Sequence, residues 1–238
     1  MYGFILLVGV LSALTIGERL CRRGGLVVTD FWRMAFYAGL FGLAGARLYH
    51  VFDYWAFFYA QPVRVLAVWE GGLGIWGAVA GAALGGFVAG GRSFVRYADV
   101  FAVCAPLAQA IGRWGNFFNK EVFGLPTSLP WGIYIPEALR PEGFKYYAHF
   151  HPLFLYESVL SMGLFVLLYK KYVSLHNKSD KPRDGIFVFT YLAGYSLIRL
   201  PLEFLRIAPW SFMGLPVAVW VGVICLFASV LFLRRQVI

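Results

Sequence analysis

Apolar residues gather in seven long segments, and polar or mixed connections separate them. A helix that spans a membrane needs about 20 mainly apolar residues, and each segment is close to that length. The pattern therefore predicts an all-α polytopic membrane protein with about seven transmembrane helices. The approximate segments are residues 2–20, 31–52, 72–90, 97–113, 152–169, 186–204 and 212–233.

The third segment is unusually rich in glycine and alanine. Small residues let helices approach each other closely in lipid, so we expect this helix to be central and tightly packed. The first segment directly follows Met1, without a basic stretch before it or a small-residue cleavage site, which indicates a retained helix rather than a cleaved signal peptide.

The connection between the fourth and fifth segments, residues 114–150, is long and is not of low complexity. It contains several prolines and aromatic residues, and Leu129–Ile135 alternates enough to form a short strand. A connection of this kind favours a small ordered head over a flexible linker. We therefore expect one transmembrane domain over residues 1–238, with residues 114–150 inserted as an extracytoplasmic head.

Composition agrees with a membrane protein, because 60% of the residues are hydrophobic and 14% are charged, whereas a soluble domain has roughly 25% charged residues. The net charge of +9 fits basic residues that flank the spans and face anionic lipid, rather than nucleic acid. Cys21, Cys104 and Cys225 lie far apart in or beside apolar runs. Without metal-binding spacing, they are expected to be buried and inert.

Basic residues are distributed unevenly between the two sets of connections. The positive-inside rule places the richer set in the cytoplasm. The N-terminus and the head are then outside, and the C-terminus is cytoplasmic. The richer set is Arg19, Arg22, Arg23, Arg92, Arg96, Lys170, Lys171, Lys178, Lys181, Arg183, Arg234 and Arg235. The poorer set is Arg64, Lys120, Arg140, Lys145 and Arg206.

Polar residues in or beside the apolar segments gather toward the outer ends of those segments, apart from Arg33 and Asp99. Ionisable groups in a membrane are costly and indicate a functional site by default, so this bias predicts a site open to the outer leaflet. The residues are Tyr2, Arg47, Tyr49, His50, Arg113, Asn116, Asn119, Glu121, His151, Tyr156, Glu157, Arg199, Glu203 and Arg206.

Spacing alone leaves the role of these residues open. Arg199, Glu203 and Arg206 are spaced to share one helix face. They fit a buried ladder that joins helices, or an arginine that keeps donors for an anion such as phosphate. The asparagines fit interhelical hydrogen bonds, and His151 before Pro152 fits a helix start. Taken together, the residues indicate a lipid substrate that bears phosphate.

Three segments carry longer motifs. Residues 112–124 read GRWGNFFNKEVFG, and residues 151–157 read HPLFLYE. The third segment is Tyr195 followed by Arg199, Glu203, Phe204 and Arg206. In order and spacing these segments resemble the bacterial phosphatidylglycerol–prolipoprotein diacylglyceryl transferase family, over nearly the whole chain. Weaker matches are Tyr2-Gly3, Gly45-Ala46-Arg47 and Gly71-Gly72.

The resemblance implies a seven-helix enzyme of the bacterial inner membrane. Such an enzyme moves the diacylglyceryl group of phosphatidylglycerol to the lipobox cysteine thiol of a prolipoprotein, forming a thioether and releasing glycerol-1-phosphate. It implies these two substrates and membrane lipids as partners, and no cofactor or metal. Positions that matter for activity in the family fall on Tyr2, Arg113, Asn116, Glu121, Gly124, Arg199 and Glu203.

The chemistry assigns expected roles. Cations near the departing phosphate lower the barrier, so Arg113 and Arg199 are expected to be catalytic, with Arg206 in support. A thiol has a pKa of about 8.5 and needs a nearby base or positive field. The candidate bases are Glu121, His151 and Glu203. The expected substrate-binding residues are Tyr2, Arg47, Asn116, Asn119, Gly124, Tyr156, Glu157, Tyr195 and Arg206.

One departure from the family keeps alternatives open. Trp76 stands where the family usually has a histidine proposed as a base, and tryptophan cannot abstract a proton. A non-catalytic relative that binds phospholipid or a lipoprotein precursor is therefore an alternative. A lipid or anion transporter is another, although it would need polar residues throughout the membrane rather than at one leaflet.

Overall fold

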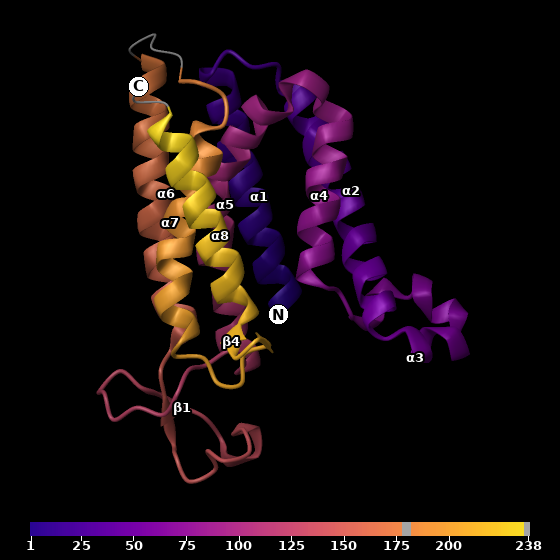
Figure 1. The fold of residues 1–238 in the computed structure, drawn as a ribbon, viewed down its shortest axis with the longest axis vertical. Helices are drawn as coiled ribbons and strands as arrows, with labels where there is room; N and C mark the ends of the chain where they lie inside the picture. Colours follow the sequence, from indigo (N-terminus) through magenta and orange to yellow (C-terminus); the bar gives the residue numbers. More distant parts are fainter. Residues whose placement is uncertain (178–181, 236–238) are drawn as a thin grey trace. The chain divides into compact units, whose positions relative to one another are not determined.

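Helices dominate the computed structural model, which describes residues 1–177 and 182–235 (Figure 1). Each of the seven predicted segments corresponds to a long helix in this part of the chain. These helices are α1 (Tyr2–Arg23), α2 (Val28–Asp53), α4 (Ile75–Gly90), α5 (Phe94–Asn119), α6 (Leu153–Asn177), α7 (Ile186–Glu203) and α8 (Val217–Arg234). Lys178 and Lys181, counted for the orientation, lie outside the described residues.

Five stretches of the described residues are long and apolar enough to cross a membrane. One of them, Ile75–Asn119, contains both α4 and α5. The helix α2, which carries Arg47, Tyr49 and His50, is not among them. The prediction of an all-α membrane protein is thus supported, and the number of seven crossings stays a prediction. The stretches are Tyr2–Arg23, Ile75–Asn119, Leu153–Asn177, Ile186–Glu203 and Val217–Arg234.

The chain forms two compact units. The first contains Met1–Leu20 and Asp99–Ile238, and the second contains Cys21–Ala98. Helices α1 and α5 therefore contribute residues to both units. The predicted single transmembrane domain over 1–238 stays a prediction.

In the first unit, close helix contacts are made at small residues. A Cβ added to Gly115 on α5 would lie 2.5 Å from Cδ2 of Tyr2, so the Tyr2 ring packs directly on this glycine. Gly9 of α1 similarly faces the carbonyl of Ala108. These contacts bring α1 against α5, as expected for helices that associate in lipid through small residues.

Asp99, near the start of α5, anchors the beginning of α7. Its carboxylate accepts hydrogen bonds from the backbone N–H groups of Gly185, Phe187 and Val188, at 2.7, 2.9 and 2.8 Å. The first N–H groups of a helix have no partner within the helix, so a buried carboxylate from another helix satisfies them. This contact explains a charged residue at the inner end of an apolar segment.

The connection between α5 and α6, called the head below, begins after Asn119, because α5 continues through residues 114–119, which the sequence pattern had assigned to this connection. This extension packs on α6, since the ring of Phe117 lies 5.0 Å from that of Phe154. Strands β1 (Ile133–Tyr134) and β2 (His149–Phe150) form an antiparallel pair, with the 3-10 helix η4 (Glu137–Leu139) between them. The short strand expected in Leu129–Ile135 is therefore confirmed as two residues.

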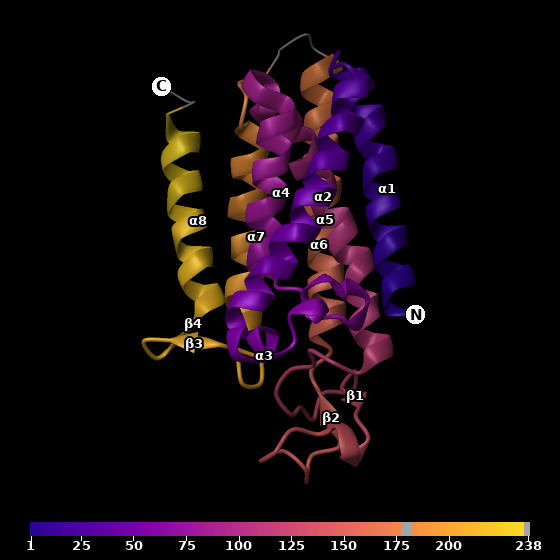
Figure 2. The same cartoon turned by 90° about the vertical axis from the view of Figure 1, so that its right-hand side faces the viewer.

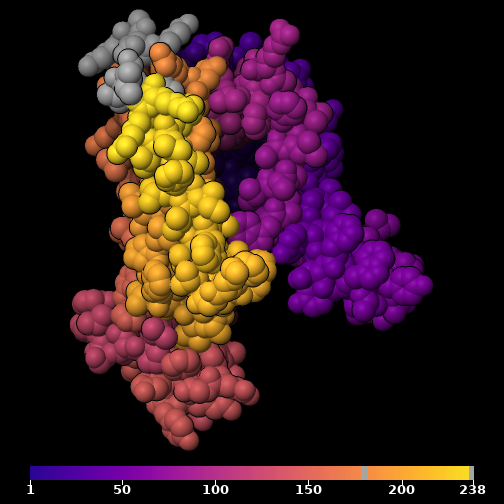
Figure 3. All heavy atoms as spheres, in the orientation of Figure 1, coloured from indigo at the N-terminus to yellow at the C-terminus, as the bar shows by residue number. Residues whose placement is uncertain are grey.

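A second hairpin precedes α8, formed by β3 (Ser211–Phe212) and β4 (Leu215–Pro216). The last helix consequently begins at Val217, later than the predicted residue 212. Figures 1 and 2 show the head, this hairpin and the start of α1 at one end of the first unit. In the space-filling view, the head extends beyond α8 at that end (Figure 3).

In the second unit, the glycines of α4 pack against α2. Cβ atoms added to Gly77, Gly81 and Gly85 would lie 2.1 to 2.3 Å from backbone oxygens of α2. The tight packing predicted for this helix is confirmed, and its central place stays a prediction. Three short helices follow α2 and project beyond it (Figure 1): α3 (Trp55–Ala60), η1 (Pro62–Leu66) and η2 (Val68–Glu70).

The cysteines largely follow the prediction. Cys21 and Cys104 are buried, whereas Cys225 on α8 is only partly so.

Candidate functional site

Glu157 of α6 lies at the centre of a polar cluster in the first unit. Its Oε1 accepts a hydrogen bond from Nη2 of Arg113 at 2.5 Å and from the hydroxyl of Tyr195 at 2.8 Å. Its Oε2 accepts one from Nη1 of Arg199 at 3.0 Å. Residues from α5, α6 and α7 therefore meet at one carboxylate.

The charges continue along α7. Nη2 of Arg199 lies 2.5 Å from Oε2 of Glu203, and Nη1 of Arg206 lies 3.3 Å from Oε1 of the same carboxylate. This is the shared face that the spacing predicted. The sequence did not predict that Glu157 joins this ladder to Arg113, because that contact links residues 44 positions apart.

Burial differs between the two signs of charge. The side chains of Glu157 and Glu203 are 2% exposed, whereas those of Arg113, Arg199 and Arg206 are 25%, 16% and 36% exposed. The carboxylates thus hold the cluster from inside, and the guanidiniums reach its surface. Three guanidiniums against two carboxylates leave an excess of positive charge, which suits an anionic ligand.

A second polar group connects the head to α6. Nε1 of Trp131 donates to the hydroxyl of Tyr156 at 2.7 Å, and that hydroxyl lies 3.1 Å from Nδ1 of His151. Tyr156 and His151 are both predicted site residues, and both are partly buried. His151 lies just before the start of α6. No sequence motif points to Trp131, because only the fold of the head brings it to Tyr156.

Backbone pairing places His151 beside the other two motifs. Gly124 donates its N–H to the carbonyl of His151 at 2.8 Å, and Gly124 also pairs with Arg206. A Cβ on Gly124 would lie 2.9 Å from both Cβ of His151 and the carbonyl oxygen of Leu205. Only glycine fits without displacement, which explains its place at the end of the first motif.

The segment after α5 has an unusual backbone. Lys120 and Val122 have φ angles of 51° and 54°, and such values are rare for a β-branched residue such as Val122. Strained residues of this kind cluster at functional sites. Between them, Glu121 is exposed, and its Oε1 accepts from Nδ2 of Asn119 at 3.4 Å. Asn116, by contrast, is buried near the end of α5.

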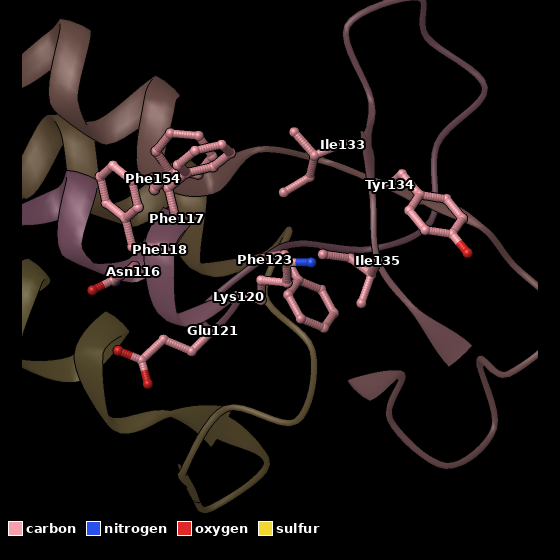
Figure 4. A pocket seen from close by; sticks show the side chains of 10 residues that line it. All are labelled: Asn116, Phe117, Phe118, Lys120, Glu121, Phe123, Ile133, Tyr134, Ile135 and Phe154. Carbon is pink, nitrogen blue, oxygen red and sulfur yellow. The ribbon is translucent and has the colours of Figure 1, made fainter. Parts of the chain in front are cut away.

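A pocket with a cavity volume of about 160 Å³ lies where α5 and α6 meet the head (Figure 4). Its walls are largely aromatic and aliphatic, with Asn116, Lys120 and Glu121 as its polar members. Two of the predicted site residues, Asn116 and Glu121, therefore line one pocket. The other lining residues are Phe117, Phe118, Phe123, Ile133, Tyr134, Ile135 and Phe154.

Arg47, like Trp76, belongs to the second unit and not to the unit that holds the charge cluster. Arg47 is buried and donates to the carbonyls of Val65, Gly71 and Gly72, at 2.9, 2.6 and 3.2 Å, and to that of Arg64. These contacts hold the segment after α3 against α2. The predicted role of Arg47 in substrate binding stays a prediction.

Comparisons with known proteins agree with the motifs. The family model described as prolipoprotein diacylglyceryl transferase matches residues 1–235. The chain is 39% identical over 211 residues to the phosphatidylglycerol–prolipoprotein diacylglyceryl transferase of Thermotoga maritima, covering 87% of this chain and 70% of that protein. It is 40% identical over 242 residues to transferase 2 of Streptomyces coelicolor, covering 96% and 73%. The transferase of Parasynechococcus marenigrum is 40% identical over 228 residues, covering 93% and 81%.

Proposed function

This chain belongs to the prolipoprotein diacylglyceryl transferase family, and on that premise we propose that it transfers the diacylglyceryl group of phosphatidylglycerol to the lipobox cysteine of a prolipoprotein. The observation that carries this proposal is the placement of Arg113 and Arg199 on the two oxygens of Glu157. Two guanidiniums fixed by one buried carboxylate form a preorganised site for phosphate.

The bonds that change define what the site must do. The cysteine sulfur attacks the carbon of the diacylglyceryl unit that is bonded to a phosphate oxygen. A C–S bond forms at this carbon, and its C–O bond to the phosphate breaks. Glycerol-1-phosphate leaves with the bonding electrons, and the thiol proton passes to a base. Negative charge therefore grows on the phosphate side, where fixed cations stabilise it without reorganising.

Arg113 and Arg199 are suited to that task. A guanidinium has five N–H donors in a planar fork, and the ion pairs with Glu157 and Glu203 use only some of them. The remaining donors are available for the phosphate oxygens. Arg206 is the most exposed arginine of the cluster and is assigned a supporting role.

Among the candidate bases, we favour Glu121. Its carboxylate is exposed and lines the pocket. Glu203 is buried and paired with two arginines, and Nδ1 of His151 is engaged with Tyr156. A base must reach the substrate within hydrogen-bond distance, and the position of Glu121 supports that role.

We place the protein in a bacterial inner membrane with seven spans, the N-terminus and head outside, and the C-terminus in the cytoplasm. The basic residues of the connections support this orientation. The charge cluster lies toward the head end of α7, which would open the active site to the outer leaflet. Asn116, Asn119 and Tyr2, which lie at or pack on the same end of α5, are assigned to substrate binding.

A transfer assay tests the proposal. The purified protein would be mixed with phosphatidylglycerol and a peptide containing a lipobox cysteine, and mass spectrometry would follow the diacylglyceryl increment and the released glycerol phosphate. Arg113→Ala and Arg199→Ala are expected to abolish the product. Arg234→Ala, at the far end of α8, is the matched control and should retain it.

The result also separates the alternatives. Absence of product from the wild-type protein, together with bound phosphatidylglycerol, would favour a non-catalytic lipid-binding relative. Movement of phosphatidylglycerol between vesicle leaflets without peptide modification would favour a transporter. Product from Arg199→Ala at the wild-type rate would overturn the phosphate-anchoring role.

A further inference from the structure

The pocket at the base of the head has two walls of different origin. One wall is helical and contains Phe117 of α5 and Phe154 of α6. The other is the β1 segment, from which Ile133 and Ile135 point toward the helices, whereas Tyr134 points away from them (Figure 4). The strand thus presents alternate apolar side chains to the pocket, as the pleat of a strand requires.

The pocket lies beside the charge cluster on both helices. On α5, Asn116 and Phe117 follow Arg113 by one turn, and on α6, Phe154 precedes Glu157 by one turn. Residues three or four apart lie on the same face of a helix. Because a helix rises about 1.5 Å per residue, these lining residues lie about 5 Å along each helix, toward the head, from the ion pair of Arg113 and Glu157.

Strand β1 also has an outward edge. Tyr134 pairs with His149 of β2, and the next residue, Ile135, donates its N–H to the carbonyl of Ala148. The carbonyl of His149 instead accepts from Thr127, on the other side of β2. Tyr134 and His149 therefore form a non-hydrogen-bonded pair, and the N–H and C=O of Tyr134 point away from β2.

Size separates the possible occupants of the pocket. Pockets that enclose whole small molecules are about 300–1,000 Å³, and this one has a cavity volume of about 160 Å³. It therefore suits a single apolar side chain. A strand edge adjacent to such a pocket is the arrangement that binds an extended peptide, since backbone hydrogen bonds supply affinity and pockets select side chains.

We propose that β1 and this pocket bind the prolipoprotein substrate in an extended conformation. The substrate backbone pairs with Tyr134, and one apolar side chain near the cysteine enters between Ile133, Ile135 and the phenylalanines of α5 and α6. An extended chain advances about 3.3 Å per residue, so the pocket side chain is roughly two residues from the cysteine that reaches the arginines. This inference rests on the proposed function and names where the polypeptide binds.

The experiment measures peptide and lipid separately. The protein in nanodiscs would be assayed with a lipobox peptide for kcat and for the KM of each substrate. The same peptide with serine in place of its cysteine would carry a fluorophore, and its binding would be followed by anisotropy. Ile133→Trp fills the pocket, and Leu139→Trp in η4, where the side chain is 50% exposed, is its control. Tyr134→Pro removes the outward N–H, and Tyr146→Pro, where the side chain is 99% exposed, is its control.

Ile133→Trp and Tyr134→Pro are expected to raise the peptide KM at least about tenfold, with kcat and the lipid KM unchanged. The affinity of these variants for the serine peptide should fall by the same factor. Both controls should remain within twofold of wild type in peptide KM and in peptide affinity. Near-ultraviolet circular dichroism would verify that each variant is folded, and Ile133→Trp decides alone if Tyr134→Pro is not.

The outcomes distinguish this inference from the proposed function. If the wild-type protein binds the serine peptide through Ile133 but forms no product, the transferase proposal fails and the binding site stands. If product forms but Ile133→Trp leaves the peptide KM unchanged, the binding site is wrong. A rise in the lipid KM instead would show that the pocket holds lipid, and would also overturn the inference.

Discussion

Glu157 and Arg113 form a 2.5 Å ion pair between α6 and α5, and only the carboxylate is deeply buried. The same carboxylate holds Arg199 of α7. A buried carboxylate that fixes two partly exposed guanidiniums determines where they lie, and leaves donors of both for a ligand. The pair therefore contributes to the fold and to the site at once.

Glu157→Ala should cost both stability and activity. Removing one partner of a buried ion pair leaves uncompensated charge, which costs about 3–5 kcal/mol. We expect a lower thermal transition in detergent and a loss of transfer at temperatures where the protein is still folded. Ser161→Ala, one turn further along α6, is the control. Its buried hydroxyl has no hydrogen-bond partner among the described residues, so its removal should be neutral. Equal stability of the two variants would show that Glu157 does not hold the cluster.

The tautomer of His151 is the second prediction. The indole N–H of Trp131 can only donate, so the proton of the Tyr156 hydroxyl is left for Nδ1 of His151. The neutral ring then carries its own proton on Nε2. Nitrogen-15 NMR of labelled histidine should report this tautomer, and Tyr156→Phe should shift the population toward the Nδ1–H form. His176, whose Nδ1 lies 2.8 Å from the carbonyl of Tyr172, gives an internal reference. A signal for Nδ1–H in the wild type would reverse the assignment.

Much of the fold follows from local patterns in the sequence. Hydropathy predicts seven helical segments, because lipid requires long apolar helices whose backbone groups are satisfied internally. The pairing of Arg199 with Glu203 follows from helix periodicity alone. Residues 114–119 were assigned to the connection, yet they continue α5 as a helix, and Phe117 packs on Phe154.

The site itself required tertiary structure. The contact of Arg113 with Glu157 and that of Trp131 with Tyr156 join residues far apart in sequence, and no spacing rule connects them. The pocket likewise depends on the approach of β1 to two helices. The motifs identified candidate site residues, whereas the fold determines which of these residues meet.

Asp99 should matter for stability more than for chemistry. It accepts hydrogen bonds from three backbone N–H groups at the start of α7, and the 18 residues of this helix place its other end, which carries Glu203, about 27 Å away. Asp99→Ala leaves buried donors without a partner, so we expect a loss of at least about 2 kcal/mol of stability. Asp99→Asn keeps one acceptor oxygen and should lose less. The thermal transition measures both, and kcat below it should stay near wild type. A normal transition with reduced kcat would contradict this role.

The last prediction concerns Arg47, because a structural role and a lipid-binding role for this residue predict opposite results. Its guanidinium donates to four carbonyls, those of residues 64, 65, 71 and 72, and lies over the ring of Phe58 at 5.1 Å. A lysine has one nitrogen and cannot reproduce this planar fork. If Arg47 holds this segment in place, Arg47→Lys and Arg47→Ala should both lower the thermal transition, by at least about 2 kcal/mol of stability. They should also speed proteolysis within residues 61–72, while the affinity of the folded protein for phosphatidylglycerol stays within twofold.

If Arg47 instead binds the lipid, the same variants should lower the affinity for phosphatidylglycerol at least about tenfold, because a lost charged contact costs more than about 1.4 kcal/mol of binding free energy. The thermal transition should then be unchanged. Arg33→Ala is the matched control, because its ion pair with Asp30 is exposed and such pairs contribute about 0–1 kcal/mol. Lipid affinity and thermal stability measured on these three variants therefore decide whether this arginine belongs to the site or to the framework around it.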